Sequence, residues 1–289
     1  MLNSKVTISL EDFVHFRDYI AQEYGMMLQD EGISVVGSKL TRLMLEINCT
    51  NLKDFISRAK NDPTGKLKND IIDIITSVET EWFRDTKPWI LFRERILPVY
   101  IDDLRNKRKE NIVIWSAGAS TGQEPYSIAM MIDETIKKEP KIQKKQFFIL
   151  ATDTSPSSIY IASSGRYSDK NMSEGMLPGY IEKYFKKTDN IYEIKPDIKK
   201  MVHFMQLDLQ DSFISLPTFD VIFCRNVVTY LSEKWRKTLY NKLLQKLDKN
   251  GYLFIGKDES LTDYSNKFDR FEFQQYSYFK PKKNESKKD

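Results

Sequence analysis

The segment from Trp115 to Ser127 carries the residue types best suited to holding a ligand. It joins an apolar run, Ile112–Trp115, to a stretch with helical spacing, and the turn between them contains Gly118 and Gly122. Glycines there let the backbone approach a ligand where a Cβ would obstruct it, although such turns also occur without ligands. Neither GxGxxG nor GxxxxGK[ST] is present, which argues against dinucleotide and nucleotide-phosphate sites. The turn therefore predicts a cofactor that is not held by its phosphates.

Asp153 follows the apolar run Phe147–Thr152 and is the second candidate ligand-binding residue. A carboxylate at the end of a parallel strand can accept hydrogen bonds from both hydroxyls of a ribose. The alternative is that Asp153 caps a helix that starts near Pro156. With the glycine turn upstream, the ribose interpretation is favoured.

Arg225 and Asn226 come directly after the apolar run Phe219–Cys224. Polar residues at this place face the ligand crevice in open α/β sheets. Alternatively, Asn226 caps a turn and Arg225 pairs with a surface carboxylate. Tyr230 follows closely and is a candidate for orienting an acceptor group, with a core tyrosine as the alternative.

The segment Thr80–Asp85 precedes the glycine turn and contains two large aromatic residues. Trp82 and Phe83 are expected in a core between domains. Arg84 could form a structural ion pair or a fork that holds a carboxylate.

Helical spacing dominates the first part of the chain. Ser9 and Asp12 predict a capping box for the first helix, and Gly25 predicts its end. The expected helices after it are Lys39–Asn48, Leu52–Lys60 and Lys66–Ser77, with a turn cluster at Asn61–Gly65.

From Asn111 onward, apolar runs with strand composition alternate with helical segments, which predicts a doubly wound parallel sheet. Between Gly165 and Lys200 the alternation stops, and this stretch predicts an inserted subdomain. The expected strands are Ile112–Trp115, Phe147–Thr152, Met201–Gln206, Phe219–Cys224, Gly251–Gly256, Phe271–Phe273 and Tyr276–Phe279, and the helices are Glu124–Lys138, Pro156–Ser163 and Glu233–Leu247.

Composition excludes several classes of function. The 45 basic and 41 acidic residues nearly balance at a net charge of +4, which argues against a nucleic-acid partner. We expect neither a signal peptide nor a membrane-spanning segment. Cys49 and Cys224 lie far apart in apolar contexts, which predicts buried thiols in a reducing cytoplasm. Two histidines argue against a histidine-rich metal site, so we expect no metal.

Taken together, these segments resemble the CheR family of chemotaxis receptor methyltransferases. The resemblance is carried by six motifs, which follow in the family's order. They are Thr80–Asp85 (T-x-F-F-R-[DE]), Trp115–Ser127 (W-S-A-G-x-S-T-G-x-E-P-Y-S), Ala151–Asp153, Ser164–Tyr167 (S-G-x-Y), Phe219–Tyr230 (F-D-x-I-F-C-R-N-V-x-x-Y) and Gly251–Ser260 (G-x-L-x-x-G-x-x-E-S).

The resemblance implies an α/β fold. A Rossmann-like, S-adenosylmethionine-dependent methyltransferase domain with a small antiparallel β-subdomain would follow an all-α N-terminal domain. The implied boundaries are residues 1–78 for a helical receptor-docking domain, 79–110 for a linker and connecting helix, and 111–289 for the methyltransferase domain, with the β-subdomain at about 165–200.

The resemblance also implies roles for individual residues. Thr80 and Arg84 would hold the methionine end of S-adenosylmethionine, and Glu124 would lie near its amino group beside Gly118 and Gly122. The remaining implied contacts are Asp153 on the ribose, Asp208 and Leu209 beside the adenine, Arg225 and Asn226 lining the crevice, Tyr230 and Arg84 at the reacting groups, and Lys39 and Arg42 for docking on the substrate.

The implied activity is methylation of glutamate side chains on the cytoplasmic helical domain of methyl-accepting chemotaxis receptors, with S-adenosylhomocysteine as the second product. The enzyme would be a cytoplasmic monomer recruited to membrane receptor clusters but not inserted in the membrane. The stretch Tyr184–Ile194 lacks the glycine loop of members that bind a receptor's C-terminal tethering peptide, so we expect no need for one. Rival interpretations are a methyltransferase of the same fold acting on a small molecule and a non-catalytic cofactor-binding module.

Three features depart from the family pattern. Val78 replaces a common asparagine and Asp208 replaces another. The helix that would dock on the receptor carries few basic residues, namely Lys39 and Arg42. Receptor choice is the property that these departures bear on most.

Overall fold

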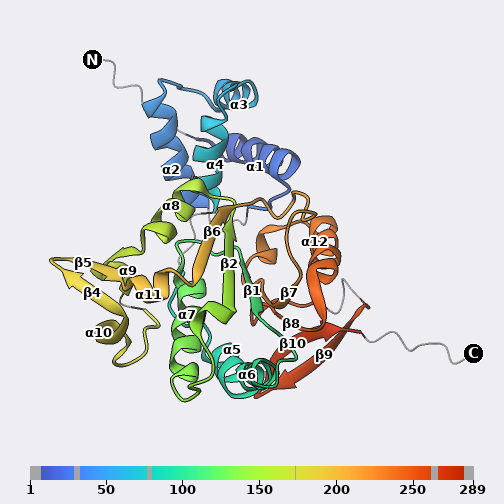
Figure 1. The fold of residues 1–289 in the computed structure, drawn as a ribbon. Coiled ribbons are helices and arrows are strands. Elements are labelled where there is room, and N and C mark those ends of the chain that lie inside the picture. The colour runs from blue at the N-terminus through green and yellow to red at the C-terminus, as the bar shows by residue number, and fades with distance from the viewer. Residues whose placement is uncertain (1–7, 29–32, 77–79, 173, 262–265, 283–289) are drawn as a thin grey trace, which may run out of the picture. The chain divides into compact units, whose positions relative to one another are not determined.

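The computed structural model describes residues 8–28, 33–76, 80–172, 174–261 and 266–282, of which residues 33–35 and 230 are described by their backbone alone. The chain divides into two compact units (Figure 1). One unit comprises Met1–Val78 and Val228–Arg236, and the other comprises Glu79–Val227 and Lys237–Asp289.

The first unit is built from helices. Ser9 caps α1 through the predicted capping box with Asp12, and Gly25 ends the helix in the left-handed region. The predicted start of the second helix at Lys39 is wrong, because α2 begins at Ile33; β-branched residues and Gly37 weaken the helical signal there. The helices are α1 (Leu10–Tyr24), α2 (Ile33–Glu46), α3 (Leu52–Lys60) and α4 (Lys66–Ile75).

Apolar side chains from all four helices form the core of the first unit. The largest fully buried ones are Phe16 and Phe55, and Cys49 is buried with them, as the sequence predicts. The segment Val228–Arg236 joins this unit through a bridge between Met26 and Leu231. It includes the 3-10 turn η4 (Val228–Tyr230).

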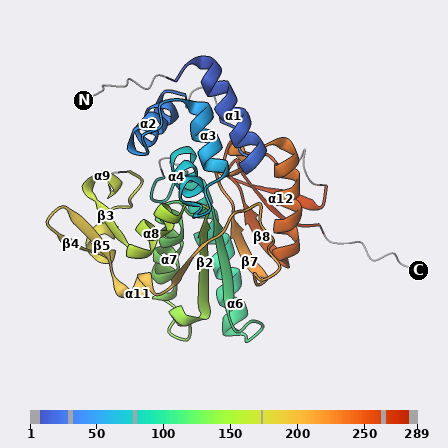
Figure 2. The same ribbon diagram turned by 90° about the horizontal axis from the view of Figure 1, so that it is seen from above.

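The second unit contains a seven-stranded sheet in the order β6-β2-β1-β7-β8-β10-β9. The first five strands in this order are parallel, and β10 is antiparallel to both neighbours. Figure 2 shows β2, β7 and β8 of this sheet from above. The predicted doubly wound sheet is confirmed. Its strands are β1 (Ile112–Ala117), β2 (Phe147–Asp153), β6 (Val202–Gln206), β7 (Phe219–Phe223), β8 (Leu247–Phe254), β9 (Phe268–Phe273) and β10 (Tyr276–Pro281).

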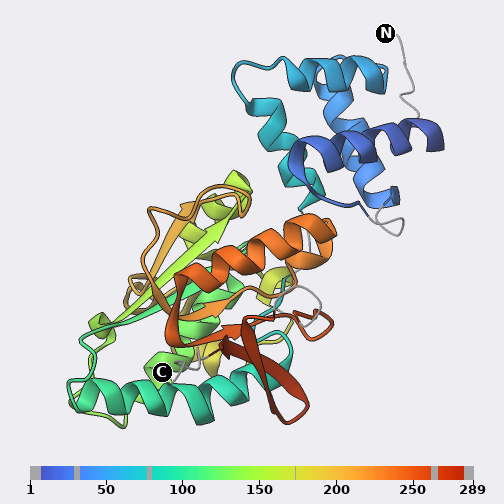
Figure 3. The ribbon, with the colours of Figure 1, turned by 90° about the vertical axis from the view of Figure 1, so that its right-hand side faces the viewer.

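Helices cover both faces of this sheet. Ile112 and Ile114 of β1 point into a core shared with α6 and α7, whereas Trp115 points to the other face and stacks on Phe219. Figure 3 shows α12 and α6 on opposite sides of the sheet. The covering elements are α5 (Thr86–Leu91), the π-helical turn η2 (Phe92–Ile96), α6 (Leu97–Arg105), α7 (Gln123–Ile136), the 3-10 turn η3 (Lys144–Gln146), α8 (Pro156–Ser164) and α12 (Glu233–Lys246). Among the described residues, no helix is long and apolar enough to cross a membrane.

Strand order reverses between β1 and β7, because the chain first builds outward through β2 and β6 and then returns on the other side. Ligands bind in open α/β sheets at the carboxyl ends of the strands beside such a reversal. The glycine turn follows β1, and Arg225 and Asn226 follow β7, so the fold brings these predicted segments to one edge.

The stretch after α8 forms the small antiparallel sheet that the family resemblance implies, in the order β3-β5-β4 (Figure 1). Thr188 pairs with Ile191, so β4 and β5 are joined by a two-residue hairpin. The elements are β3 (Arg166–Ser168), α9 (Asp169–Met172), α10 (Tyr180–Tyr184), β4 (Phe185–Thr188), β5 (Ile191–Ile194) and α11 (Pro196–Lys199).

Candidate active site

The turn after β1 is built around two glycines in the left-handed region, with φ of 80° at Gly118 and 95° at Gly122. A Cβ on Gly118 would lie 2.4 Å from Val227 Cγ2, and one on Gly122 would lie 2.9 Å from the Cβ of Ala162. Both glycines are therefore required by neighbouring protein atoms, a packing role that the sequence did not predict. Their predicted role beside a ligand is a separate one. The backbone N–H of Gly118 donates to Thr152 O at 2.8 Å and fixes the turn against β2.

Asp153 ends β2 and is held from two sides. Its Oδ2 accepts from the backbone N–H of Ser120 at 2.8 Å, and Oδ1 accepts from that of Ser155 at 3.0 Å. The N-cap of α8 is Ser155, whose Oγ accepts from Ser158 N, so the alternative in which Asp153 caps this helix is wrong. Ser120 has a left-handed φ of 49°, and Asp153 thus stabilises a strained turn residue.

The loop that carries Asp208 and Leu209 continues from β6 beside Asp153. Leu207 N donates to Asp153 O at 3.0 Å, which places this loop next to the end of β2. Lys242 of α12 donates from Nζ to Leu209 O at 2.7 Å, and burial lowers the pKa of Lys242. Sequence reasoning missed this lysine, because its role depends on a contact between distant segments.

Arg225 is the centre of a buried ion network. Its guanidinium is 1% exposed and lies 2.8 Å from Asp85 Oδ2 and 3.0 Å from Glu124 Oε2. Burial opposes its charge, but the carboxylates of Glu124 and Asp85 leave the pKa of Arg225 above its ordinary value. Glu124 Oε1 also accepts from Ser116 Oγ at 2.8 Å. Arg225 therefore faces into the protein and connects β7 with the start of α7 and with the Thr80–Asp85 segment.

The backbone of Arg84 is also held in this network. Its carbonyl oxygen accepts from Arg225 Nη2 at 2.8 Å and from Trp89 Nε1 at 2.9 Å. The Arg84 side chain is half-buried and forms no ion pair with the described residues, so the structural ion pair considered for it is not seen. Thr80 is half-buried at the other end of the segment.

Trp82 and Phe83 pack in the core of the second unit, so the expectation of an interdomain core is wrong for them. The Trp82 ring contacts Phe185 of the small sheet, and Trp82 N donates to Glu174 O at 3.3 Å. A Cβ on Gly175 would lie 1.8 Å from Trp82 O, so only glycine fits at this approach. The small subdomain therefore supports the segment that carries Thr80 and Arg84.

Asn226 has a left-handed φ of 57° and is held by Glu259. Glu259 Oε2 accepts from Asn226 N at 3.0 Å and from Gly256 N at 2.6 Å. This carboxylate ties the ends of β7 and β8 together beyond their last ladder bonds. Glu259 lies in the Gly251–Ser260 motif, and its place in that motif was the one feature of the sequence that pointed to this residue.

The predicted docking residues belong to the first unit. Arg42 pairs with Glu46 at 2.9 Å on the exposed surface of α2, and Lys39 lies half-buried on the same helix. The side chain of Tyr230 lies outside the described residues, and so does Val78.

Several carboxylates lie at the carboxyl edge of the sheet near the ends of β6, β2, β1 and β7. Glu124 and Asp85 are balanced by Arg225, whereas Asp153 ends β2 and Asp208 lies in the loop after the neighbouring strand β6. Carboxylates here suit a ligand with hydroxyl groups and positive charge better than a phosphate. Among the described residues, no group of three His, Cys, Asp or Glu side chains could hold a metal ion.

Comparison with known proteins gives consistent matches. A family model described as the S-adenosylmethionine-binding domain of CheR methyltransferase matches residues 78–277. "Chemotaxis protein methyltransferase Cher2" of Pseudomonas putida is 34% identical over 86% of this chain and 90% of its own length. "Chemotaxis protein methyltransferase 1" of Pseudomonas aeruginosa is 36% identical over 87% of this chain and 91% of its own length. A solved TehB-like methyltransferase from Corynebacterium glutamicum is 15% identical with a TM-score of 0.37, and the match covers 63% of this chain and 86% of that chain.

Proposed function

Because this chain belongs to the CheR family of methyltransferases, we propose that it methylates glutamate side chains of methyl-accepting chemotaxis receptors. Its methyl donor is S-adenosylmethionine, the cofactor of the matched domain. The products are glutamate methyl esters and S-adenosylhomocysteine.

The nucleoside end of the cofactor is assigned to the β2 and β6 side of the strand reversal. Asp153 accepts hydrogen bonds from the ribose hydroxyls, and its orientation by Ser120 and Ser155 suits that task. Asp208 and Leu209 flank the adenine from the neighbouring loop. The fit rests on the chemistry of this edge, where the carboxylates of Asp153 and Glu124 contact the glycine turn and the end of β1.

The methionine end is assigned to the β1 and β7 side. Arg84 and Thr80 hold its carboxylate, and Glu124 at the start of α7 lies near its amino group. Arg225 positions Arg84 and Glu124 by contacting both, while Asn226 lines the crevice.

The reaction needs no general base. Bound S-adenosylmethionine supplies a methyl group on a sulfonium sulfur, and the glutamate that receives it is ionised at neutral pH because its pKa is about 4.3. The residues of this chain therefore act by holding the two reactants in line and by excluding water. We assign the orientation of the acceptor carboxylate to Tyr230, and Arg84 acts at the reacting groups through its hold on the methionine end of the cofactor.

The observation that carries the proposal is the single network around Arg225. It joins the Thr80–Asp85 segment, the Trp115–Ser127 segment and the Phe219–Tyr230 segment at one edge of the sheet. These three segments are the ones whose motifs resemble the family.

Receptor recognition is assigned to the first unit, where Lys39 and Arg42 on α2 would attract acidic receptor helices. We further propose a cytoplasmic monomer that is recruited to receptor clusters and does not need a C-terminal tethering peptide.

The test uses purified protein, methyl-tritiated S-adenosylmethionine and membranes that carry chemotaxis receptors. The proposal predicts label on the receptor and little label on small molecules of a cell extract. Label confined to a small molecule, with none on receptor, would contradict it.

A further inference from the structure

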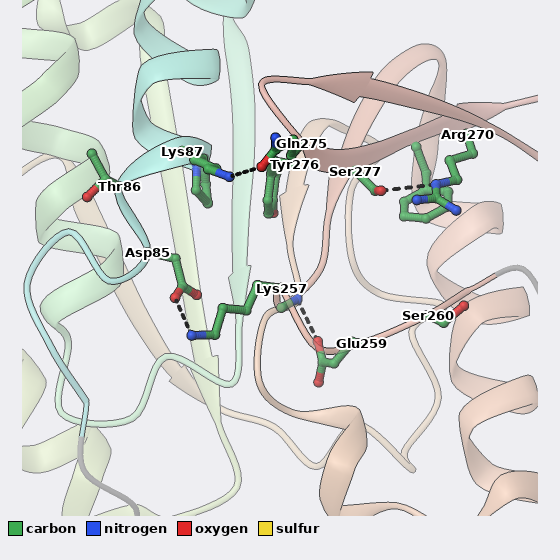
Figure 4. Close-up of a pocket in the computed structure, with 13 residues that line it drawn as sticks. Asp85, Thr86, Lys87, Lys257, Glu259, Ser260, Arg270, Gln275, Tyr276 and Ser277 are labelled. Carbon is green, nitrogen blue, oxygen red and sulfur yellow. Dashed lines mark hydrogen bonds and ion pairs between the residues drawn. The ribbon is translucent and has the colours of Figure 1, made fainter.

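A cavity of about 490 Å³ lies beyond the carboxyl end of β8 (Figure 4). Its walls come from the start of α5, the loop after β8 and the β9–β10 hairpin, all within the second unit. This volume is in the range of roughly 300–1,000 Å³ found for ligand sites. The roles proposed above assign no residue of this cavity to a ligand.

Two residues that line the cavity also take part in the site described above. Asp85 lines the cavity and also lies 2.8 Å from Arg225 Nη2. Glu259 lines it and accepts from the backbone of Asn226 at 3.0 Å. The nucleoside is assigned to β2 and β6, and β8 lies on the other side of the reversal. The cavity therefore lies on the side of the strand reversal that is away from the assigned nucleoside position.

Three cations from three elements line the cavity (Figure 4), and two of them donate to neutral side chains. Lys87 Nζ donates to Gln275 Oε1 at 3.2 Å, and Arg270 Nε donates to Ser277 Oγ at 3.0 Å. Within the described part of the chain, neither Lys87 nor Arg270 forms an ion pair. Both therefore retain N–H donors for a further partner.

The third cation, Lys257, has a side chain that is 63% exposed and lies 3.8 Å from Asp85 Oδ1. Asp85 is closer to Arg225, and Glu259 accepts two backbone N–H groups, so both carboxylates of the lining are engaged by the protein. The cavity thus presents a surplus of positive charge. Ammonium and guanidinium groups form their strongest hydrogen bonds with carboxylates or phosphates.

We infer that this cavity binds a carboxylate of the protein substrate that neighbours the acceptor glutamate, with Lys87, Lys257 and Arg270 as donors. The inference rests on the proposed function, since the substrate is taken to be an acidic helical protein. Side chains three or four residues apart on a helix are about 5–6 Å apart at Cβ. A second acidic side chain, one turn from the acceptor, would therefore enter the cavity while the acceptor faces the methyl group.

The test compares Lys87→Gln/Lys257→Gln with wild type on receptor-bearing membrane vesicles, using tritiated S-adenosylmethionine. The KM for receptor should rise roughly fivefold at low salt, as expected for the loss of two partly exposed ion pairs. The rise should shrink at high salt, because exposed charges are screened. The dissociation constant for S-adenosylmethionine and kcat should stay within about twofold of wild type, since the change is in substrate attraction.

A matched control, Lys145→Gln/Lys249→Gln, removes two exposed lysines from the amino ends of β2 and β8 and should leave KM unchanged. Receptors in which the acidic residue one turn from each acceptor is replaced by glutamine should show the same raised KM, with no further rise in the double lysine variant. An unchanged KM in Lys87→Gln/Lys257→Gln overturns the inference, as does a matching loss of cofactor affinity. Absence of any receptor methylation by wild type would instead contradict the proposed function.

Discussion

Arg225 shows how one buried side chain can connect the separate segments of a site. Its guanidinium is buried between Asp85 and Glu124, and it also donates to the carbonyl of Arg84. Removing the cation from such a network leaves two carboxylates without their partner in a protein interior.

We therefore expect Arg225→Met to lower the free energy of unfolding by roughly 3–5 kcal/mol. The matched control is Arg108→Met, which removes an exposed arginine paired with Asp102 and Asp103 and should cost at most about 1 kcal/mol. Urea denaturation followed by circular dichroism measures both. Equal, small effects would show that the Arg225 network adds little to stability.

Asp153 gives the second test at this scale. Asp153→Ala should weaken S-adenosylmethionine binding by a few kcal/mol, because two charge-assisted hydrogen bonds of roughly 1.5–3 kcal/mol each would be lost. Isothermal titration calorimetry measures the affinity, and the control is Asp197→Ala, which removes an exposed aspartate of α11. Unchanged affinity in a folded Asp153→Ala protein would limit Asp153 to bracing the glycine turn.

At the scale of elements, periodicity and turn residues predict most of the helices and strands. Ser9, Gly25 and the alternation after Asn111 depend on local chemistry, which a sequence displays directly. The start of α2 could not be predicted, because weak helix formers there are stabilised by the rest of the unit.

Within the candidate site, the motifs pointed to the right segments but not to how they are connected. Glu259 and Lys242 act through backbone groups of distant loops, and Gly175 is required by the approach of Trp82. Such roles depend on the fold, and residue type and spacing do not reveal them.

The approach of Gly175 to Trp82 can be tested with a second glycine as control. Gly175 and Gly179 have similar φ values of 79° and 76°. A Cβ on Gly175 would lie 1.8 Å from Trp82 O, whereas a Cβ on Gly179 would have no neighbour within 4 Å. We expect Gly179→Ala to cost about 1–2 kcal/mol of stability from the left-handed backbone alone. Gly175→Ala should cost at least about 1–3 kcal/mol more. Thermal unfolding compares them, and equal losses would mean that the close approach to Trp82 does not constrain this position.

The β4–β5 hairpin is the feature on which the expected independence of a receptor's C-terminal tethering peptide rests. It turns in two residues with Asp189 in the left-handed region, and it contains no glycine. Peptide addition to a sheet edge needs reachable backbone groups, which a glycine loop favours. We expect receptor C-terminal peptides to bind weakly or not at all in a fluorescence titration. Low-micromolar binding would contradict this expectation.

At the scale of the whole molecule, the proposed function divides two tasks between the two units. The second unit holds the glycine turn, the Arg225 network and the cavity beyond β8. The first unit carries Lys39 and Arg42, the residues assigned to receptor docking. A protein acceptor requires surface beyond a small pocket, and a separate helical unit could supply it.

The most direct test of the central claim is the chemical bond that the transferred methyl group forms. Receptor labelled by this protein with tritiated S-adenosylmethionine is treated with mild alkali, and volatile radioactivity is collected as methanol. An ester on glutamate predicts nearly complete release, because the carboxylate is regenerated by hydroxide while amide and N-methyl bonds persist. Label that stays on the receptor after this treatment would contradict glutamate methylation.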